Sequence, residues 1–125
     1  MVRDLDARGW DEALGDASKP LVVEFWHDQC IWCKRLAPIY DEIEKDYPGV
    51  SFARLNILSS AENSAIGEKN GVMGTPTTKV FCEGREVGEI VGFMEKGDFK
   101  LQLDGILKNS GRCLKSTTPI NGDKP

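Results

Sequence analysis

Two periodicities alternate along this chain. Short apolar runs of strand length stand between longer stretches whose apolar residues recur every three or four positions. The segment 21–26 is apolar at nearly every position, which is typical of a strand covered on both faces of a sheet. In chain order, the pattern predicts a helix over 10–17, a strand over 21–26, a helix over 30–47, a strand over 50–57, a helix over 61–70, strands over 77–82 and 87–91, and a helix over 93–107.

The order of these elements predicts a topology. A strand followed by a helix and a second strand indicates a right-handed crossover between parallel strands. Glu83, Gly84 and Arg85 are a hairpin signal between the last two strands, so that pair is expected to be antiparallel. The expected fold class is therefore α/β, with a mixed central sheet flanked by helices on both faces. We expect one domain over residues 1–113 and a flexible C-terminal tail over 114–125, where no period is found.

The composition narrows the class of protein. The chain has 125 residues, enough for one domain with its own core. Sixteen Lys and Arg residues against 20 Asp and Glu residues give a net charge of −4, which argues against nucleic acid as the partner. No apolar run reaches the roughly 18–20 residues that span a bilayer, so no membrane insertion is expected. The first 19 residues lack the apolar core of a signal peptide, which favours a cytoplasmic location; an extracytoplasmic protein whose signal peptide has been removed is the alternative.

Cys30 and Cys33 stand where the apolar strand gives way to the longest predicted helix. The start of a helix has unpaired N–H groups and the positive end of the helix dipole, so the pKa of a thiol there falls from about 8.5 toward about 7 or below. Cys33, one turn further, is close enough to form a disulfide with Cys30, and such a pair is suited to disulfide exchange. A zinc site would need two more ligands, but the only histidine is His27, and Cys82 and Cys113 form no second pair of this kind. Two buried structural cysteines are the other alternative.

Two longer segments add to this pair. The segment 23–34, VEFWHDQCIWCK, with Pro38 after it, resembles the active-site region of the thioredoxin family. The segment 70–77, NGVMGTPT, resembles the family's cis-proline loop, and Gly92 with the pair at 96–97 resembles its closing segment. The resemblance covers about residues 5–109. It implies a thioredoxin-like fold and a thiol-disulfide oxidoreductase.

The resemblance also implies roles for single residues. Cys30 corresponds to the attacking thiol and Cys33 to the resolving thiol. Glu24 corresponds to a buried carboxylate that handles the proton of the resolving cysteine, and Arg54 to a lysine near that carboxylate. Trp26 corresponds to the tryptophan that packs beneath the active site.

Substrate binding is expected at four residues. Pro76 corresponds to the cis-proline packed against the disulfide, and the backbone of Thr75 would pair with a bound substrate segment. Trp32 and Gly92 complete the expected groove. The implied partners are protein disulfides and a reductase that restores the dithiol. No metal and no organic cofactor is implied, and the protein is expected to be a monomer.

Several positions depart from the family's pattern and bear on the direction of exchange. Ile31 and Trp32 stand between the cysteines in place of Gly-Pro, Gln29 stands in place of Trp, and Glu24 in place of Asp. Thr75 precedes the proline in place of Ile, a pattern also found in extracytoplasmic thiol-disulfide proteins. Reduction of protein disulfides is the expected function. An extracytoplasmic disulfide oxidase or isomerase and a non-catalytic thioredoxin-fold adaptor are the alternatives.

Overall fold

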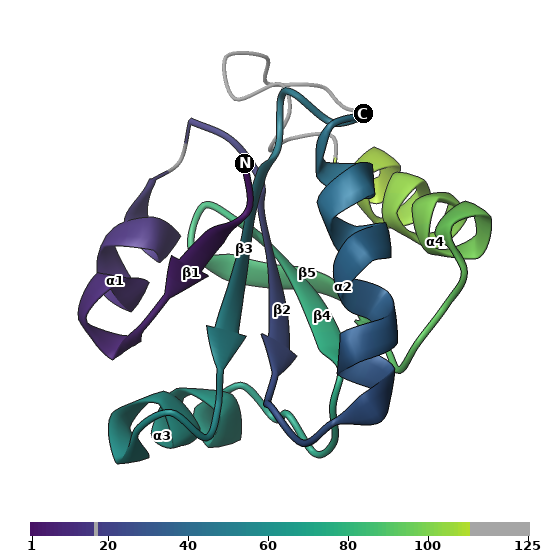
Figure 1. Cartoon of the computed structure of the whole chain (residues 1–125). Coiled ribbons are helices and arrows are strands. Elements are labelled where there is room, and N and C mark those ends of the chain that lie inside the picture. The colour runs from purple at the N-terminus through teal and green to yellow at the C-terminus, as the bar shows by residue number, and fades with distance from the viewer. Residues whose placement is uncertain (17, 111–125) are drawn as a thin grey trace.

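The computed structural model describes residues 1–16 and 18–110 (Figure 1). These residues form one five-stranded sheet with helices on both faces. The expected tail over 114–125, and Cys113, lie outside them; within them, no helix is long and apolar enough to cross a membrane. In chain order, the elements are β1 (Arg3–Leu5), α1 (Ala7–Gly15), β2 (Leu21–Trp26), α2 (Ile31–Glu44), β3 (Ser51–Asn56), α3 (Ala61–Lys69), β4 (Thr77–Cys82), β5 (Arg85–Val91) and α4 (Lys96–Asn109).

The sheet mixes parallel and antiparallel pairs. Its strand order is β1-β3-β2-β4-β5. β3 pairs in parallel with β1 and β2, whereas β4 pairs antiparallel with β2 and β5. β2 is therefore the central strand, and its Glu24 lies between Arg54 of β3 and Thr78 of β4. The mixed α/β sheet predicted from the order of the elements is confirmed.

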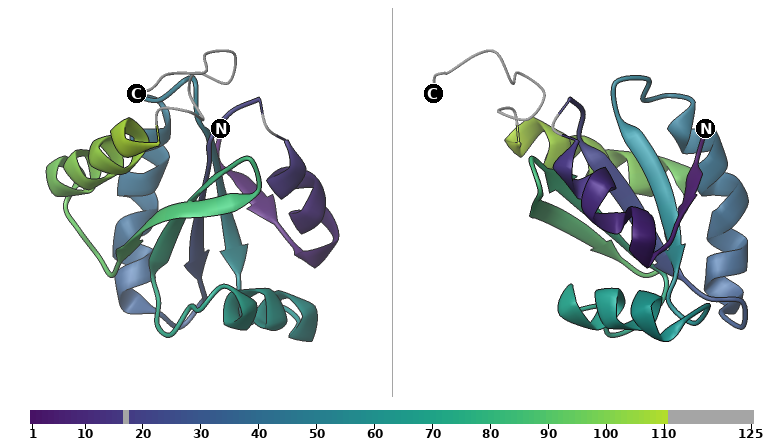
Figure 2. Two further views of the ribbon diagram at one scale, coloured as in Figure 1. Left: turned by 180° about the vertical axis from the view of Figure 1, so that it is seen from behind. Right: turned by 90° about the vertical axis from the view of Figure 1, so that its left-hand side faces the viewer.

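Two helices cover each face of this sheet (Figure 2). On one face, α2 and α4 enclose an apolar core that includes Tyr40 and Phe99. On the other face, α1 and α3 enclose a second core that includes Trp10 and Ile66. Because both faces are covered, β2 and β4 are buried at every position except the last of each strand. This double burial explains the nearly continuous apolar run over 21–26.

Polar side chains fix where three of the helices begin. Asp6 accepts a hydrogen bond from the backbone N–H of Arg8 at the start of α1, and the Ser60 hydroxyl accepts one from Asn63 at the start of α3. Such caps satisfy N–H groups that have no partner within the helix. At the start of α2 the capping atom is the sulfur of Cys30.

The structure differs from the predicted elements mainly at their ends. The hydrophobic pattern does not predict β1, because two of its three residues are charged and exposed. α1 begins at Ala7, earlier than predicted, because Asp6 caps it there. α2 ends at Glu44 rather than at 47, α4 begins at Lys96 rather than at 93, and β5 begins at Arg85 rather than at 87.

A tight turn joins β4 to β5, as the hairpin signal predicted. Glu83 and Gly84 both have positive φ angles, 53° and 82°, which is typical of a type I′ turn. The helix α4 then packs closely over β5: a Cβ atom added at Gly88 would lie 2.7 Å from the side chain of Ile106. The absence of a side chain at this position sets how near α4 lies to the sheet.

Candidate active site

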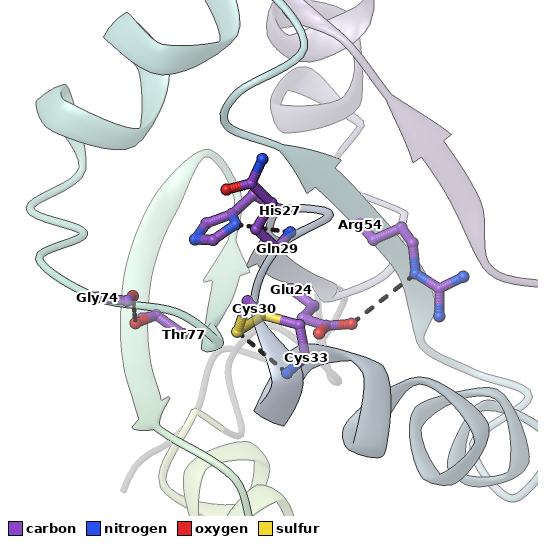
Figure 3. Close-up of a disulfide and its surroundings, with 8 residues drawn as sticks. All are labelled: Glu24, His27, Gln29, Cys30, Cys33, Arg54, Gly74 and Thr77. Atoms are coloured by element: carbon purple, nitrogen blue, oxygen red, sulfur yellow. Dashed lines mark hydrogen bonds and ion pairs between the residues drawn. A yellow bond between two sulfur atoms is a disulfide. The ribbon is translucent and has the colours of Figure 1, made fainter.

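Cys30 and Cys33 form a disulfide at the junction of β2 and α2 (Figure 3). Their Cα atoms are 5.2 Å apart. The Cys30 sulfur accepts a hydrogen bond of 3.1 Å from the backbone N–H of Cys33 and lies at the positive end of the α2 dipole. Both features stabilise a thiolate at Cys30 once the disulfide is reduced. Cys30 is also the more accessible of the two residues, at 8% exposed against 2% for Cys33.

Glu24 is a buried carboxyl group beside this disulfide (Figure 3). Burial withdraws it from water and raises its pKa from the ordinary value of 4.5 to about 7. The Arg54 guanidinium, whose Nε lies 3.8 Å from Oε1 of Glu24, lowers this pKa and so opposes the effect of burial, while the Asp41 carboxylate raises it further. A carboxyl group with a pKa near 7 accepts and donates a proton with similar ease at neutral pH.

The loop before β4 contains a cis peptide bond between Thr75 and Pro76. The Pro76 carbonyl oxygen accepts a hydrogen bond of 2.8 Å from the backbone N–H of Gly92, which has a φ of 87°, a conformation favoured by glycine. The Thr77 hydroxyl donates to the carbonyl oxygen of Gly74 at 2.7 Å (Figure 3). These bonds fix the loop on both sides of the proline.

Strand register brings this loop to the same end of the sheet as the disulfide. Thr77, the first residue of β4, pairs with Phe25 near the end of β2. The residues just before β4 therefore lie close to those just after β2, where Cys30 caps α2. The active-site segment and the cis-proline loop, which the sequence suggested for the site, therefore lie at the same end of the sheet.

Apolar side chains are exposed around the disulfide. Ile31 and Trp32 lie between the cysteines, and Met73 lies within the cis-proline loop, before Pro76; all three are exposed. The Trp32 ring contacts the Phe93 ring, with centroids 5.5 Å apart, and the Arg35 guanidinium lies 4.9 Å from its centre. These contacts hold the Trp32 ring in place while leaving 48% of the residue exposed. An exposed apolar surface of this kind is suited to contact an apolar partner.

The family model for thioredoxin matches residues 1–104. The chain belongs to the thioredoxin family. The thioredoxin of Pseudomonas aeruginosa is 36% identical over 89 residues, which cover 70% of this chain and 80% of that protein. The thioredoxin of Alicyclobacillus acidocaldarius is 32% identical over 91 residues, which cover 72% of this chain and 84% of that protein.

Longer plant relatives also match this thioredoxin-family chain. The chloroplastic M-type thioredoxin of Zea mays is 27% identical over 106 residues, which cover 84% of this chain and 62% of that protein. The M-type thioredoxin of Brassica napus is 31% identical over 100 residues, covering 79% of this chain and 55% of that protein. The chain thus matches between about half and two thirds of the length of these two relatives.

Other candidate residues of this thioredoxin-family protein lie outside the reactive pair. Nδ1 of His27 accepts a hydrogen bond of 3.2 Å from the backbone N–H of Gln29, and the His27 carbonyl oxygen accepts one from Cys30, so His27 shapes the turn before α2. Cys82 ends β4, at the far end of that strand from Pro76, and is not a free thiol. Over residues 1–16 and 18–110, no group of three His, Cys, Asp or Glu side chains is placed to hold a metal ion.

Sequence reasoning missed two residues near Glu24. Asp41 and Tyr40 both face Arg54 from α2. Tyr40 lies within the helix predicted over 30–47, but the helical period does not reveal that its hydroxyl donates a hydrogen bond of 2.7 Å to the carbonyl oxygen of Ala53. Asp41 carries no sequence signal at all, because an exposed acidic residue on a helix is common.

Proposed function

We propose that this protein catalyses dithiol–disulfide exchange and acts as a reductant of protein disulfides. The observation that carries the proposal is the Cys30–Cys33 disulfide at the start of α2, with the Cys30 sulfur bonded to the N–H of Cys33. Membership of the thioredoxin family supports the same reaction. The reaction needs a stabilised thiolate that a substrate can reach and a second thiol close to it. Cys30 caps α2 and is 8% exposed, and Cys33 lies one turn further along this helix.

In the proposed mechanism, the Cys30 thiolate attacks one sulfur of a substrate disulfide. A bond forms between that sulfur and Cys30, the substrate S–S bond breaks, and the other substrate sulfur leaves as a thiolate that takes up a proton. Glu24 then accepts the proton of the Cys33 thiol. The resulting Cys33 thiolate attacks the Cys30 sulfur, the mixed disulfide breaks, and the second substrate sulfur leaves as a thiolate that takes up a proton from solvent. The Cys30–Cys33 disulfide remains. The substrate gains two electrons, and a reductase returns two electrons to the protein.

Glu24 is suited to the proton transfer because its pKa of about 7 lies near the operating pH. A carboxyl group with the ordinary pKa of 4.5 would be a weaker base toward a thiol. The protonated form is also available to return a proton when the disulfide is reduced again. This role depends on Glu24 remaining in the apolar surroundings of β2.

The substrate is proposed to bind as an extended segment beside the cis-proline loop. The backbone of Thr75 pairs with this segment in the manner of an added strand, while Pro76 and Gly92 keep the loop in place. The exposed Trp32 ring contacts apolar side chains of the substrate. The proposal includes a monomer that works in the cytoplasm, where thiols are kept reduced.

Turnover in a disulfide-reduction assay tests the activity. The wild-type protein should reduce a model protein disulfide with many turnovers when a chemical dithiol regenerates it. An absence of turnover would contradict the proposal and favour a non-catalytic adaptor. The reduction potential tests the direction, because family values run from about −270 mV for reductants to about −120 mV for strong oxidants. A value near the upper end would replace the proposed reductant with an oxidase.

A further inference from the structure

The Arg54 guanidinium lies between two carboxylates that differ in exposure. Its Nε lies 3.8 Å from Oε1 of Glu24, while Nη2 donates a hydrogen bond of 2.9 Å to Oδ1 of Asp41. The side chains are 2% exposed for Glu24, 19% for Arg54 and 54% for Asp41. Within the described residues, the hydrogen bond of Arg54 thus goes to the exposed carboxylate, and the buried one is left at ion-pair distance.

The helix α2 holds this arginine from two sides. The ring of Tyr40 lies 5.7 Å from the guanidinium carbon of Arg54, and Asp41, the next residue, supplies the hydrogen bond. Tyr40 itself is fully buried, with its hydroxyl 3.1 Å and 2.7 Å from the carbonyl oxygens of Val22 and Ala53. The position of Arg54 is therefore set by the same helix that begins at the disulfide.

The groups that face Glu24 come from three neighbouring elements. Arg54 from β3 and Asp41 from α2 act on its pKa, and Tyr40 of α2 lies close enough that the Glu24 charge raises the pKa of the Tyr40 hydroxyl. Thr78 of β4, directly opposite in the sheet, is uncharged. Burial raises the pKa of Glu24, Arg54 lowers it, and Asp41 raises it again. A hydrogen bond from Arg54 to Glu24 in place of Asp41 would lower this pKa much further, because such a bond stabilises the charged form directly.

We propose that Asp41 is a positioning residue for the exchange reaction: it binds Arg54 and so prevents a direct hydrogen bond to Glu24, which leaves Glu24 free to take up the proton of Cys33. The inference rests on the proposed function. Asp41 does not touch the reacting sulfur atoms. It acts through Arg54, across the gap between α2 and β3.

The substitution Asp41→Asn tests this role through the acidity of Glu24. Asparagine removes the charge of Asp41 and leaves Arg54 only a neutral, weaker acceptor; both changes favour the Glu24 carboxylate, so the pKa of Glu24 should fall by about 0.5–1. The Glu24 carboxyl ¹³C chemical shift, followed against pH in the oxidised protein, measures it. Glu42→Gln is the matched control, because it removes the same charge from the next residue of α2, which pairs with Lys96 instead. Asp41→Glu should restore the wild-type pKa.

A kinetic measurement links this acidity to exchange. The rate of the resolving step is followed against pH in single turnovers, and the pH at which this rate is half of its maximum is compared between variants. In Asp41→Asn this midpoint should shift to lower pH by the same amount as the Glu24 pKa. In Glu42→Gln it should stay where it is in the wild type. An active Asp41→Asn protein whose Glu24 pKa matches that of the Glu42→Gln control overturns the inference alone. A wild-type protein without exchange overturns the proposed function, and the role of Asp41 in it, whatever the chemical shifts show.

Discussion

Glu24→Gln should change how the stability of this protein depends on pH. A carboxyl group whose pKa is higher in the folded chain than in the unfolded chain binds its proton more tightly when folded. Its contribution to stability is therefore complete below the unfolded-state pKa and is lost as pH rises through the folded-state pKa. Glutamine keeps the shape of the side chain and remains neutral at every pH. The variant should thus lack this pH-dependent loss.

The magnitude follows from the burial of Glu24. Its side chain is 2% exposed, so solvent screens the effect little. A rise in pKa from 4.5 to about 7, at roughly 1.36 kcal/mol per pH unit, corresponds to about 3 kcal/mol. Between about pH 4 and pH 8, the free energy of unfolding of the wild type should therefore fall by about 3 kcal/mol relative to that of Glu24→Gln.

Urea unfolding of the two oxidised proteins at several pH values measures this difference. The pKa values of Asp16 and Asp46 are lowered in the folded chain by their hydrogen bonds to Ser18 and Lys100, so these carboxylates lose stabilisation as pH falls. Because both proteins share those groups, their contributions cancel in the difference. A difference that stays constant with pH would refute the reasoning, since it would mean that Glu24 titrates as it does in the unfolded chain.

Three further predictions concern the site and the packing of α4. Cys30→Ser should abolish exchange, whereas Cys33→Ser should accumulate mixed disulfides with a model substrate, and mass spectrometry that finds trapping only in Cys30→Ser would reverse the assignment. We expect the Thr75 hydroxyl to stabilise the Cys30 thiolate, so Thr75→Ile should raise the pKa of the Cys30 thiol; thiolate absorbance against pH measures it, and an unchanged value would remove that role. Gly88→Ala should destabilise the fold by about 1–3 kcal/mol because the new Cβ would lie 2.7 Å from Ile106, and an unchanged melting temperature would show that α4 shifts freely.

Burial on both faces explains why much of the fold was predictable from the sequence. A strand covered on both sides needs apolar residues at nearly every position, so β2 and β4 were predicted with their observed bounds. Helices that cover one face show their period through residues such as Leu36 and Ile43, which are both fully buried. β1 was missed because an edge strand of three residues, mostly exposed, needs no apolar pattern.

In the candidate site too, some residues could be predicted from the sequence and others could not. Cys30 and Cys33 were proposed because a pair one helical turn apart is close both in sequence and in space, whereas Glu24 was proposed from its place in the segment that resembles the family's active-site region. The cis-proline loop was found only through the family resemblance. The contact between Asp41 and Arg54 was missed because it joins a helix to a strand across a turn, and no local spacing reports a contact of this kind.

The pairing of β2 with β4 also has a consequence for the nascent chain. Ribosomes make the chain from its N-terminus, so both cysteines leave the exit tunnel well before Thr77, the residue that pairs with Phe25 at the active end of the sheet. Until β4 is synthesised, the thiols of Cys30 and Cys33 are present without the Pro76 loop beside them. Translation thus separates in time the two halves of a site that the folded sheet holds side by side.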